Sequence, residues 1–133
     1  MRRSWCGKPE SLLRLRLLAE ALTVLAADAQ TQVAWLVRHR VGADEIALDF
    51  EHALRVAEGL AEESLLDRAV LLHLREIDAV FNGMSGAEST DRWRLDALSA
   101  DEGWARTREL ARLVLVAHLG GWEKPLPQIG IIR

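Results

Sequence analysis

The 133-residue sequence has few of the residues that β-sheets and disulfide-bonded folds require. It contains no tyrosine, two phenylalanines, three prolines and one asparagine. Because strands and tight turns depend on aromatic, β-branched, glycine and proline residues, this shortage argues against a β-rich fold. The single cysteine, Cys6, excludes an intramolecular disulfide and a metal site built from several cysteines. It also fits a reducing compartment, and we therefore expect a cytoplasmic protein.

Long apolar segments are also missing. The longest stretch without a formal charge is Leu113–Trp122, ten residues, whereas a membrane-spanning helix needs about 18 or more. Near the N-terminus, Arg14, Arg16 and Glu20 interrupt a segment that a secretion signal would keep uncharged. The sequence therefore predicts neither a signal peptide nor contact with a membrane.

The short motifs of common enzyme families are absent. The sequence has no phosphate-binding glycine loop of the G-x-x-x-x-G-K-[ST] or G-x-G-x-x-G type, no G-x-S-x-G nucleophile turn and no H-E-x-x-H zinc helix. We assign no catalytic residue, cofactor or metal. The absence of these motifs argues against catalysis, although it does not exclude an active site assembled from residues far apart in the sequence.

Leucine and alanine dominate what is present, with 42 positions between them. This composition predicts an all-α protein: one helical bundle domain over residues 1–133, with four long helices and one short helix. Residues 1–8 are expected to form a flexible basic N-terminus. Pro125 and Pro127 predict an extended tail over residues 122–133, and its alternating isoleucines suit a strap packed on the bundle.

The first predicted helix is too long for its neighbours. Apolar residues recur at three- and four-residue steps over residues 9–40, without glycine or proline, although Gln32 interrupts the stripe. One helix of this length would run about 45–50 Å, against about 25–30 Å for the later helices. Two outcomes are open: a break near Asp28–Thr31, or an overhang that forms a homodimer through residues 9–40.

Three further long helices follow. Their signals are Asp44 as a first-turn cap, Ser64 followed by Asp67 as the start of the third helix with Asn82-Gly83 at its end, and a capping box from Ser99 to Glu102. The second helix has an apolar face of Ile46, Phe50, Ala53, Leu54, Ala57 and Leu60. A short helix with Trp93, Leu95 and Leu98 is expected after Thr90-Asp91. The last long helix should stop at Gly120-Gly121.

Charge is distributed in blocks that the net value of −3 conceals. Residues 1–40 carry a net +4, residues 41–105 a net −10 and residues 106–133 a net +3. One interpretation is that basic outer helices neutralise acidic inner ones. The other is that the acidic block binds a basic partner surface. The acidic block argues against nucleic acid as a partner.

The four histidines offer an alternative site. His52, His73 and His118 fall on different predicted helices and could line a pocket inside the bundle. Dinuclear metal bundles, however, use repeated Glu-x-x-His pairs with further glutamates, and the sequence has only the imperfect Asp49-x-x-His52. These histidines are therefore candidates for a ligand pocket and not for a metal site.

The function that the sequence favours is a small cytoplasmic protein–protein interaction module without catalysis. Its finer form is an acidic inhibitor or immunity-type protein. Arginine outnumbers lysine by 15 to 2, which suggests a GC-rich genome and a bacterial source. The alternative is a ligand-binding bundle or enzyme with a pocket near His52, His73 and His118. Tryptophan and arginine are enriched at binding hot spots, so the expected partner-binding residues are Asp49, Glu51, Glu58, Glu62, Arg92, Trp93 and Arg94.

Overall fold

The computed structural model describes residues 9–85 and 91–118, and all regular secondary structure in these ranges is helical. The all-α prediction is therefore confirmed. The N-terminus 1–8 and the tail 122–133, for which the sequence predicts flexible and extended chain, lie outside the described residues. Six helices follow one another in the order α1 (Pro9–Ala26), α2 (Ala29–His39), α3 (Asp44–Glu62), α4 (Arg68–Met84), α5 (Ala97–Ala100) and α6 (Glu102–His118).

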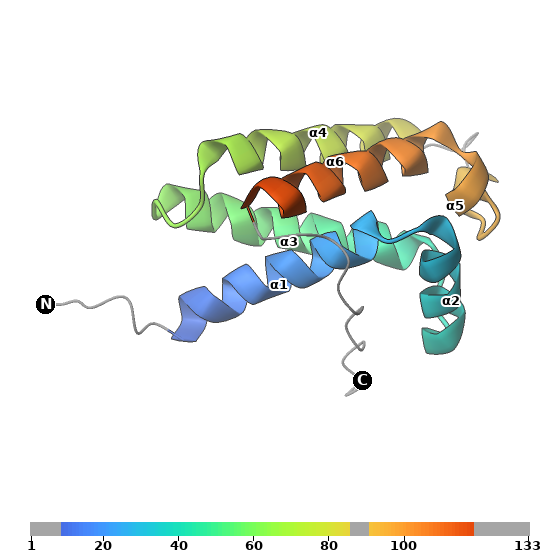
Figure 1. Cartoon of the computed structure of the whole chain (residues 1–133), viewed down its shortest axis with the longest axis horizontal. Coiled ribbons are helices and arrows are strands. Elements are labelled where there is room, and N and C mark those ends of the chain that lie inside the picture. Colours follow the sequence, from blue (N-terminus) through green and yellow to red (C-terminus); the bar gives the residue numbers. More distant parts are fainter. Residues whose placement is uncertain (1–8, 86–90, 119–133) are drawn as a thin grey trace, which may run out of the picture.

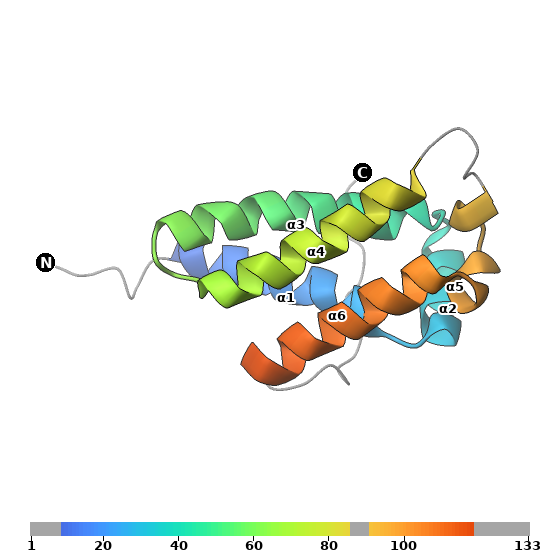
Figure 2. The same cartoon turned by 90° about the horizontal axis from the view of Figure 1, so that it is seen from above.

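Four of these helices form an antiparallel bundle. α1 packs against α3 and α6, and α4 packs against the same two helices, so the four enclose one core (Figures 1 and 2). α2 and α5 lie together at one end of the bundle, where α2 connects α1 to α3 and α5 precedes α6. The described chain thus has five helices of eleven or more residues and one short helix, instead of four and one.

The extra helix arises from a break at Asp28, which confirms one of the two outcomes expected for residues 9–40. Asp28 has φ −59° and ψ 151°, an extended conformation between α1 and α2. α1 has 18 residues, about 27 Å, and α3 has 19, so the two helices match in length. α1 therefore does not overhang α3, and helix length no longer favours a homodimer. The homodimer itself stays a prediction.

The break is held by side chains that bind the last carbonyl groups of α1, which have no partner within the helix. The Gln32 side chain is fully buried and donates hydrogen bonds to the carbonyl oxygens of Val24 and Leu25, at 3.1 and 2.9 Å. Two arginines of α6 bind the next two carbonyls: Arg112 donates to Ala26 at 2.7 Å and Arg108 to Ala27 at 3.1 Å. The polar residue that interrupts the apolar stripe is therefore the one that ends α1.

α3 begins at Asp44, as the sequence predicts, whereas α4 begins at Arg68, four residues after Ser64, and the capping mechanism expected for Asp44 is wrong. The predicted apolar face of α3 is buried at all six positions. Asp44 is the first residue of α3 and its side chain makes no capping hydrogen bond. Asp67 does cap α4, since its carboxylate accepts from the backbone N–H of Ala69 at 2.8 Å.

The region before α6 corrects two further expectations. The short helix is α5, which holds Leu98 but neither Trp93 nor Leu95. The capping box is wrong, because the Ser99 hydroxyl donates to the carbonyl of Asp96 instead of capping a helix. The cap of α6 is Asp101, whose carboxylate accepts from the backbone N–H of Gly103 at 2.6 Å. The charge of Asp101 favours this position, since an anion is stabilised at a helix N-terminus.

Candidate interaction surface

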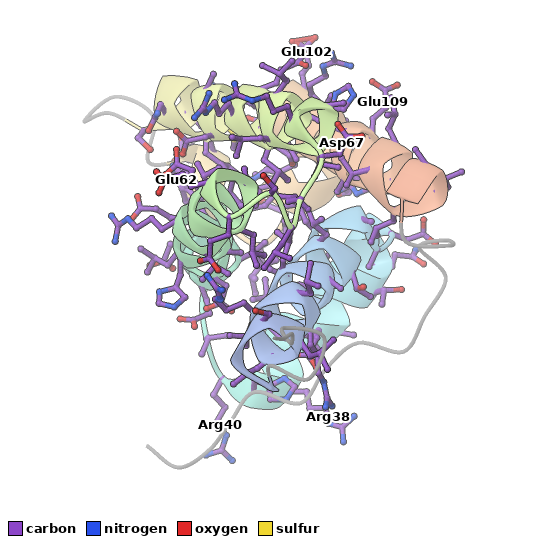
Figure 3. The ribbon with its side chains drawn as sticks, turned by 90° about the vertical axis from the view of Figure 1, so that its left-hand side faces the viewer. Arg38, Arg40, Glu62, Asp67, Glu102 and Glu109 are labelled. Carbon is purple, nitrogen blue, oxygen red and sulfur yellow. The ribbon has the colours of Figure 1, made fainter. Side chains whose placement is uncertain are left out.

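The outer face of α3 carries a row of charged side chains around one exposed leucine. Six positions at three- and four-residue steps share this face. We call this row the acidic stripe, and it consists of Asp44, Leu48, Glu51, Arg55, Glu58 and Glu62. The side chain of Glu62 projects outward at the end of α3 (Figure 3). Over its whole length, α3 contains six carboxylates and one arginine.

The stripe gathers three of the four acidic residues that the sequence proposes as partner contacts. Glu51, Glu58 and Glu62 belong to it. Asp49 is exposed but precedes Glu51 by two residues, and residues two apart on a helix do not share a face. The sequence-based set therefore mixes two sides of α3, because it was selected by residue type and not by helical position.

Leu48 is the apolar member of the stripe, and the sequence-based set lacks it together with Asp44 and Arg55. Its side chain is 56% exposed, in the middle of a polar face. Its spacing gives the signal, because Leu48 lies four residues after Asp44 and three before Glu51, out of phase with the buried face. An exposed apolar side chain loses contact with water when a partner covers it, which favours binding.

Internal ion pairs neutralise part of the acidic block but little of this face. Between helices, Arg106 of α6 binds Glu76 of α4 at 2.7 Å, and Arg14 of α1 binds Glu63, just past α3, at 2.9 Å. These pairs agree with neutralisation between the blocks. Within the stripe, Glu51 meets Arg55 at 3.3 Å and Glu58 meets Arg75 at 3.6 Å. All four groups in the stripe's pairs are largely exposed, so solvent screens their attraction.

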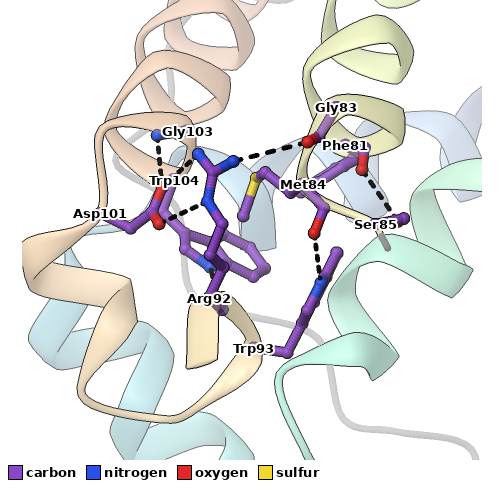
Figure 4. A network of polar contacts seen from close by, with 9 residues as sticks. All are labelled: Phe81, Gly83, Met84, Ser85, Arg92, Trp93, Asp101, Gly103 and Trp104. Atoms are coloured by element: carbon purple, nitrogen blue, oxygen red, sulfur yellow. Dashed lines mark hydrogen bonds and ion pairs between the residues drawn. The ribbon is translucent and has the colours of Figure 1, made fainter. Parts of the chain in front are cut away.

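Arg92 and Trp93 are engaged in contacts within the chain (Figure 4). The guanidinium of Arg92 forms two hydrogen bonds to the carboxylate of Asp101, at 2.7 and 3.0 Å. This partner raises the pKa of Arg92 and lowers the pKa of Asp101. The indole N–H of Trp93 donates to the carbonyl of Met84 at 3.0 Å. Their polar atoms therefore join the segment before α5 to the ends of α4 and α6.

The ring of Trp93 belongs to an aromatic cluster at this end of the core. Its centroid lies 5.9 Å from that of Phe81 and 5.5 Å from that of Trp104. Trp104 is fully buried, and Trp35 is 7% exposed. Trp93 is half-buried and covers the end of the bundle. Trp122, the other tryptophan expected at the surface, lies outside the described residues.

Arg94 has a different setting from its two neighbours. Its side chain is 67% exposed and lies 3.4 Å from the carboxylate of Asp96. Both residues line an open cavity of about 500 Å³ together with Asp91, Arg92, Ala97, Ala100 and Asp101. The cavity holds two arginines and three aspartates, and these opposite charges give it no preference for an anion or a cation.

Two of the three candidate histidines have side chains that the structure describes, and they lie on different helices. His52 is exposed on α3, and His73 is half-buried on α4. His118 is the last residue of α6, and its side chain is outside the described part of the chain. Within that part, no group of three or more histidine, cysteine, aspartate or glutamate residues could hold a metal ion. A ligand pocket near these histidines stays a prediction.

Basic residues gather away from the stripe. Arg38 and Arg40 extend from the end of α2, on the side of the molecule opposite Glu102 and Glu109 of α6 (Figure 3). Arg40 ends α2 in a left-handed conformation, with φ 58°. The sequence suggests Gly42 as this stop, two residues later.

Sequence reasoning also missed two half-buried arginines of α6 that bind the end of α1. Arg108 and Arg112 look like ordinary surface residues in the sequence, yet they bind the turn after α1. Burial lowers the pKa of Arg108, and the nearby charge of Arg112 lowers it further. No signal in a single sequence identifies these contacts, because their partners are 76 to 86 residues away.

Comparison of the chain with known proteins does not identify a family. No family model, curated protein or solved structure matches the chain. Among the described helices, none combines the length and apolar character needed to cross a membrane. The functional argument therefore rests on the surface of the molecule itself.

Proposed function

We propose that the protein is a protein–protein interaction module without catalysis of its own. It binds a basic surface of a partner through the acidic stripe on α3. The observation that carries this proposal is the exposed leucine, Leu48, within a row of exposed carboxylates. An anchor that loses water at the centre of a contact and charges that steer the approach are the two parts of a specific interface.

The charges contribute mainly to the rate of association. A row of carboxylates attracts a basic surface over several ångströms, and such fields raise association rates about tenfold to a thousandfold at low salt. Salt screens exposed charges within about 8–10 Å at physiological ionic strength. Binding through the stripe should therefore weaken steeply as salt is added.

The finer form of the proposal is an inhibitor or immunity-type protein. α3 has 19 residues, a length of about 28 Å, along which Asp44, Glu51, Glu58 and Glu62 present negative charge. A rigid helix of this length and charge would fit a basic cleft that normally holds an anionic substrate. Rigidity favours this role because little conformational freedom is lost on binding.

The test is capture of a partner from the native host at low salt, followed by measurement with the purified partner. The altered chain carries Glu51→Gln, Glu58→Gln and Glu62→Gln. We expect the partner held by the unaltered chain to bind this variant with an association rate lower by about tenfold or more. Leu48→Ser should instead accelerate dissociation, because it removes the apolar anchor.

A matched control separates the stripe from general charge. The control chain carries Glu20→Gln, Glu76→Gln and Glu109→Gln, which change the net charge by the same amount. These glutamates also sit in exposed ion pairs, with Arg16 and Arg106, so their loss should leave binding unchanged. No retained protein at low salt, or equal binding by both variants, would contradict the proposal.

A further inference from the structure

One side of α1 loses its cover toward the N-terminus of the helix. Five residues at three- and four-residue steps form a stripe on the α6 side of α1. Side-chain exposure increases along this stripe toward the N-terminus of α1: the first two residues are buried, the next two are half-buried, and the last is 61% exposed. The residues, in that order, are Ala26, Leu22, Ala19, Leu15 and Leu12.

The α3 side of the same helix stays covered throughout. Leu25, Leu18 and Ser11 are 0, 2 and 7% exposed, and Arg14 holds Glu63 on this side. The difference between the two sides shows that α3 reaches the N-terminal end of α1 whereas α6 does not. Among the described residues, the N-terminal half of α1 therefore has no helix packed over the side that faces α6 elsewhere.

A contact between α1 and α6 shows where α6 ends relative to α1. The Arg112 side chain binds the carbonyl of Ala26, so these residues lie at the same level of an antiparallel pair. From Arg112, α6 continues six residues to His118, about 9 Å. That distance brings its end level with Glu20, and Leu12 lies about 12 Å farther along α1.

The chain that continues from this point has the length and composition to supply the cover. Fifteen residues follow His118, enough to span about 50 Å when extended, and four of them would reach Leu12. Six of the fifteen are large apolar residues: Leu119, Trp122, Leu126, Ile129, Ile131 and Ile132. Pro125 and Pro127 oppose a helix and favour extended chain, which can lie along a helix surface.

We propose that residues 119–133 continue from α6 along the N-terminal half of α1 and pack apolar side chains over Leu12 and Leu15. The tail then completes the fourth side of the bundle, from the level at which α6 stops. The alternative occupant of this surface is a second copy of the chain, which the experiment distinguishes. The proposal is independent of the acidic stripe, which lies on another helix.

The experiment measures proximity in the full-length protein by paramagnetic broadening in nuclear magnetic resonance. A nitroxide is attached to Arg16→Cys in a Cys6→Ser background, and the amide signals of residues 119–133 are recorded. Arg16 is exposed and one turn from Leu12, so the label leaves the apolar surface intact. The matched control label is at Arg55→Cys on α3, since Arg55 sits in a similar exposed pair with a glutamate four residues away.

We expect the label at position 16 to remove tail signals that the label at position 55 leaves visible. Adding Leu12→Asp should restore those signals, whereas Leu72→Asp on α4, at a side chain 65% exposed, should not. Equal effects of the two labels, or no effect of Leu12→Asp, would overturn the proposal. Signal loss in a mixture of nitroxide-bearing and isotope-enriched chains would instead assign the surface to a second copy.

Discussion

Arg108 of α6 donates a hydrogen bond to the buried side chain of Gln32 in α2, with 3.1 Å between Nη2 and Oε1. The same guanidinium donates to the carbonyl oxygens of Ala27, at 3.1 Å, and Leu98, at 2.7 Å. One side chain therefore connects α6 with α2, with α5 and with the turn after α1. The break between α1 and α2 depends on this connection.

Replacing Arg108 with leucine should lower the free energy of unfolding by about 2–4 kcal/mol. The substitution leaves several acceptors without their donor, and each unsatisfied buried group costs about 1–3 kcal/mol. Urea denaturation followed by circular dichroism measures the change. Arg106→Leu on the same helix is the control, because Arg106 forms only exposed pairs with Glu76 and Glu109 and should cost less than about 1 kcal/mol. Similar losses for the two variants would contradict the assigned role of Arg108.

Two glycines near the α4–α6 contact should respond in opposite directions to alanine. A Cβ on Gly103 would lie 2.5 Å from the sulfur of Met84, which is fully buried, and we expect Gly103→Ala to destabilise the protein by about 1–3 kcal/mol. A Cβ on Gly83 meets no atom within 4 Å, so Gly83→Ala in α4 should stabilise it by up to about 1 kcal/mol. Thermal unfolding measures both. A tolerated Gly103→Ala would show that Met84 moves aside.

Stability should fall in acid partly through Asp101. Hydrogen bonds from Arg92 hold the pKa of this carboxyl below its ordinary value of 3.8. A carboxyl with a lowered pKa stabilises the folded state above the ordinary value, and this contribution disappears as the pH falls through the lowered one. Asp101→Asn keeps an oxygen that can cap α6 but loses the negative charge that pairs with Arg92 and favours the helix N-terminus, and it should therefore cost about 1–2 kcal/mol at pH 7.

The pH series supplies the control for this assignment. The difference between the unaltered chain and Asp101→Asn should shrink as the pH is lowered below 3.8. Asp96→Asn is the matched variant, because Asp96 is 78% exposed in its pair with Arg94, and it should change stability little at any pH. A difference for Asp101→Asn that stays constant from neutral to acid pH would refute the electrostatic part of the argument.

Trp93 provides a test between a structural role and a partner contact. Its ring packs on Phe81 and Trp104, so Trp93→Ala should destabilise the protein by about 2–3 kcal/mol, below the full cost of a buried tryptophan because Trp93 is only half-buried. Trp93→Phe keeps the ring and loses the hydrogen bond to Met84, at about 1 kcal/mol. Unchanged stability in both variants, with weakened partner binding, would favour the contact role.

The periodic parts of the structure could be predicted from the sequence because they depend on neighbours along one helix. The six apolar positions of α3 all became its buried face. The pair Ser64 and Asp67 located the start of α4, although the cap is Asp67. Capping at α6 was harder to predict, since Ser99 and Asp101 are both competent caps. The choice of Asp101 coincides with its pair to Arg92, nine residues earlier in the chain.

The candidate surface was predictable in charge but not in geometry. Counting charges located the acidic block, and helical spacing then separates Glu51, Glu58 and Glu62 from Asp49. Spacing also makes Leu48 visible once the direction of the core is known. Arg92 and Trp93 could not be assigned in this way, because their partners lie on α4 and α6.

The sequence alone determined that this protein is helical, that α3 begins at Asp44, and which face of α3 is buried, because these properties depend on local spacing and composition. Tertiary structure alone decided that residues 9–40 divide at Asp28. Gln32 binds carbonyl groups at the end of α1 from within this segment, and it is visible in the sequence as an interruption of the apolar stripe. The bonds from Arg108 and Arg112 of α6 span more than 70 residues and leave no periodic trace in the chain. The same reason explains why the side of α1 near Leu12 is exposed: its cover depends on where a distant helix stops.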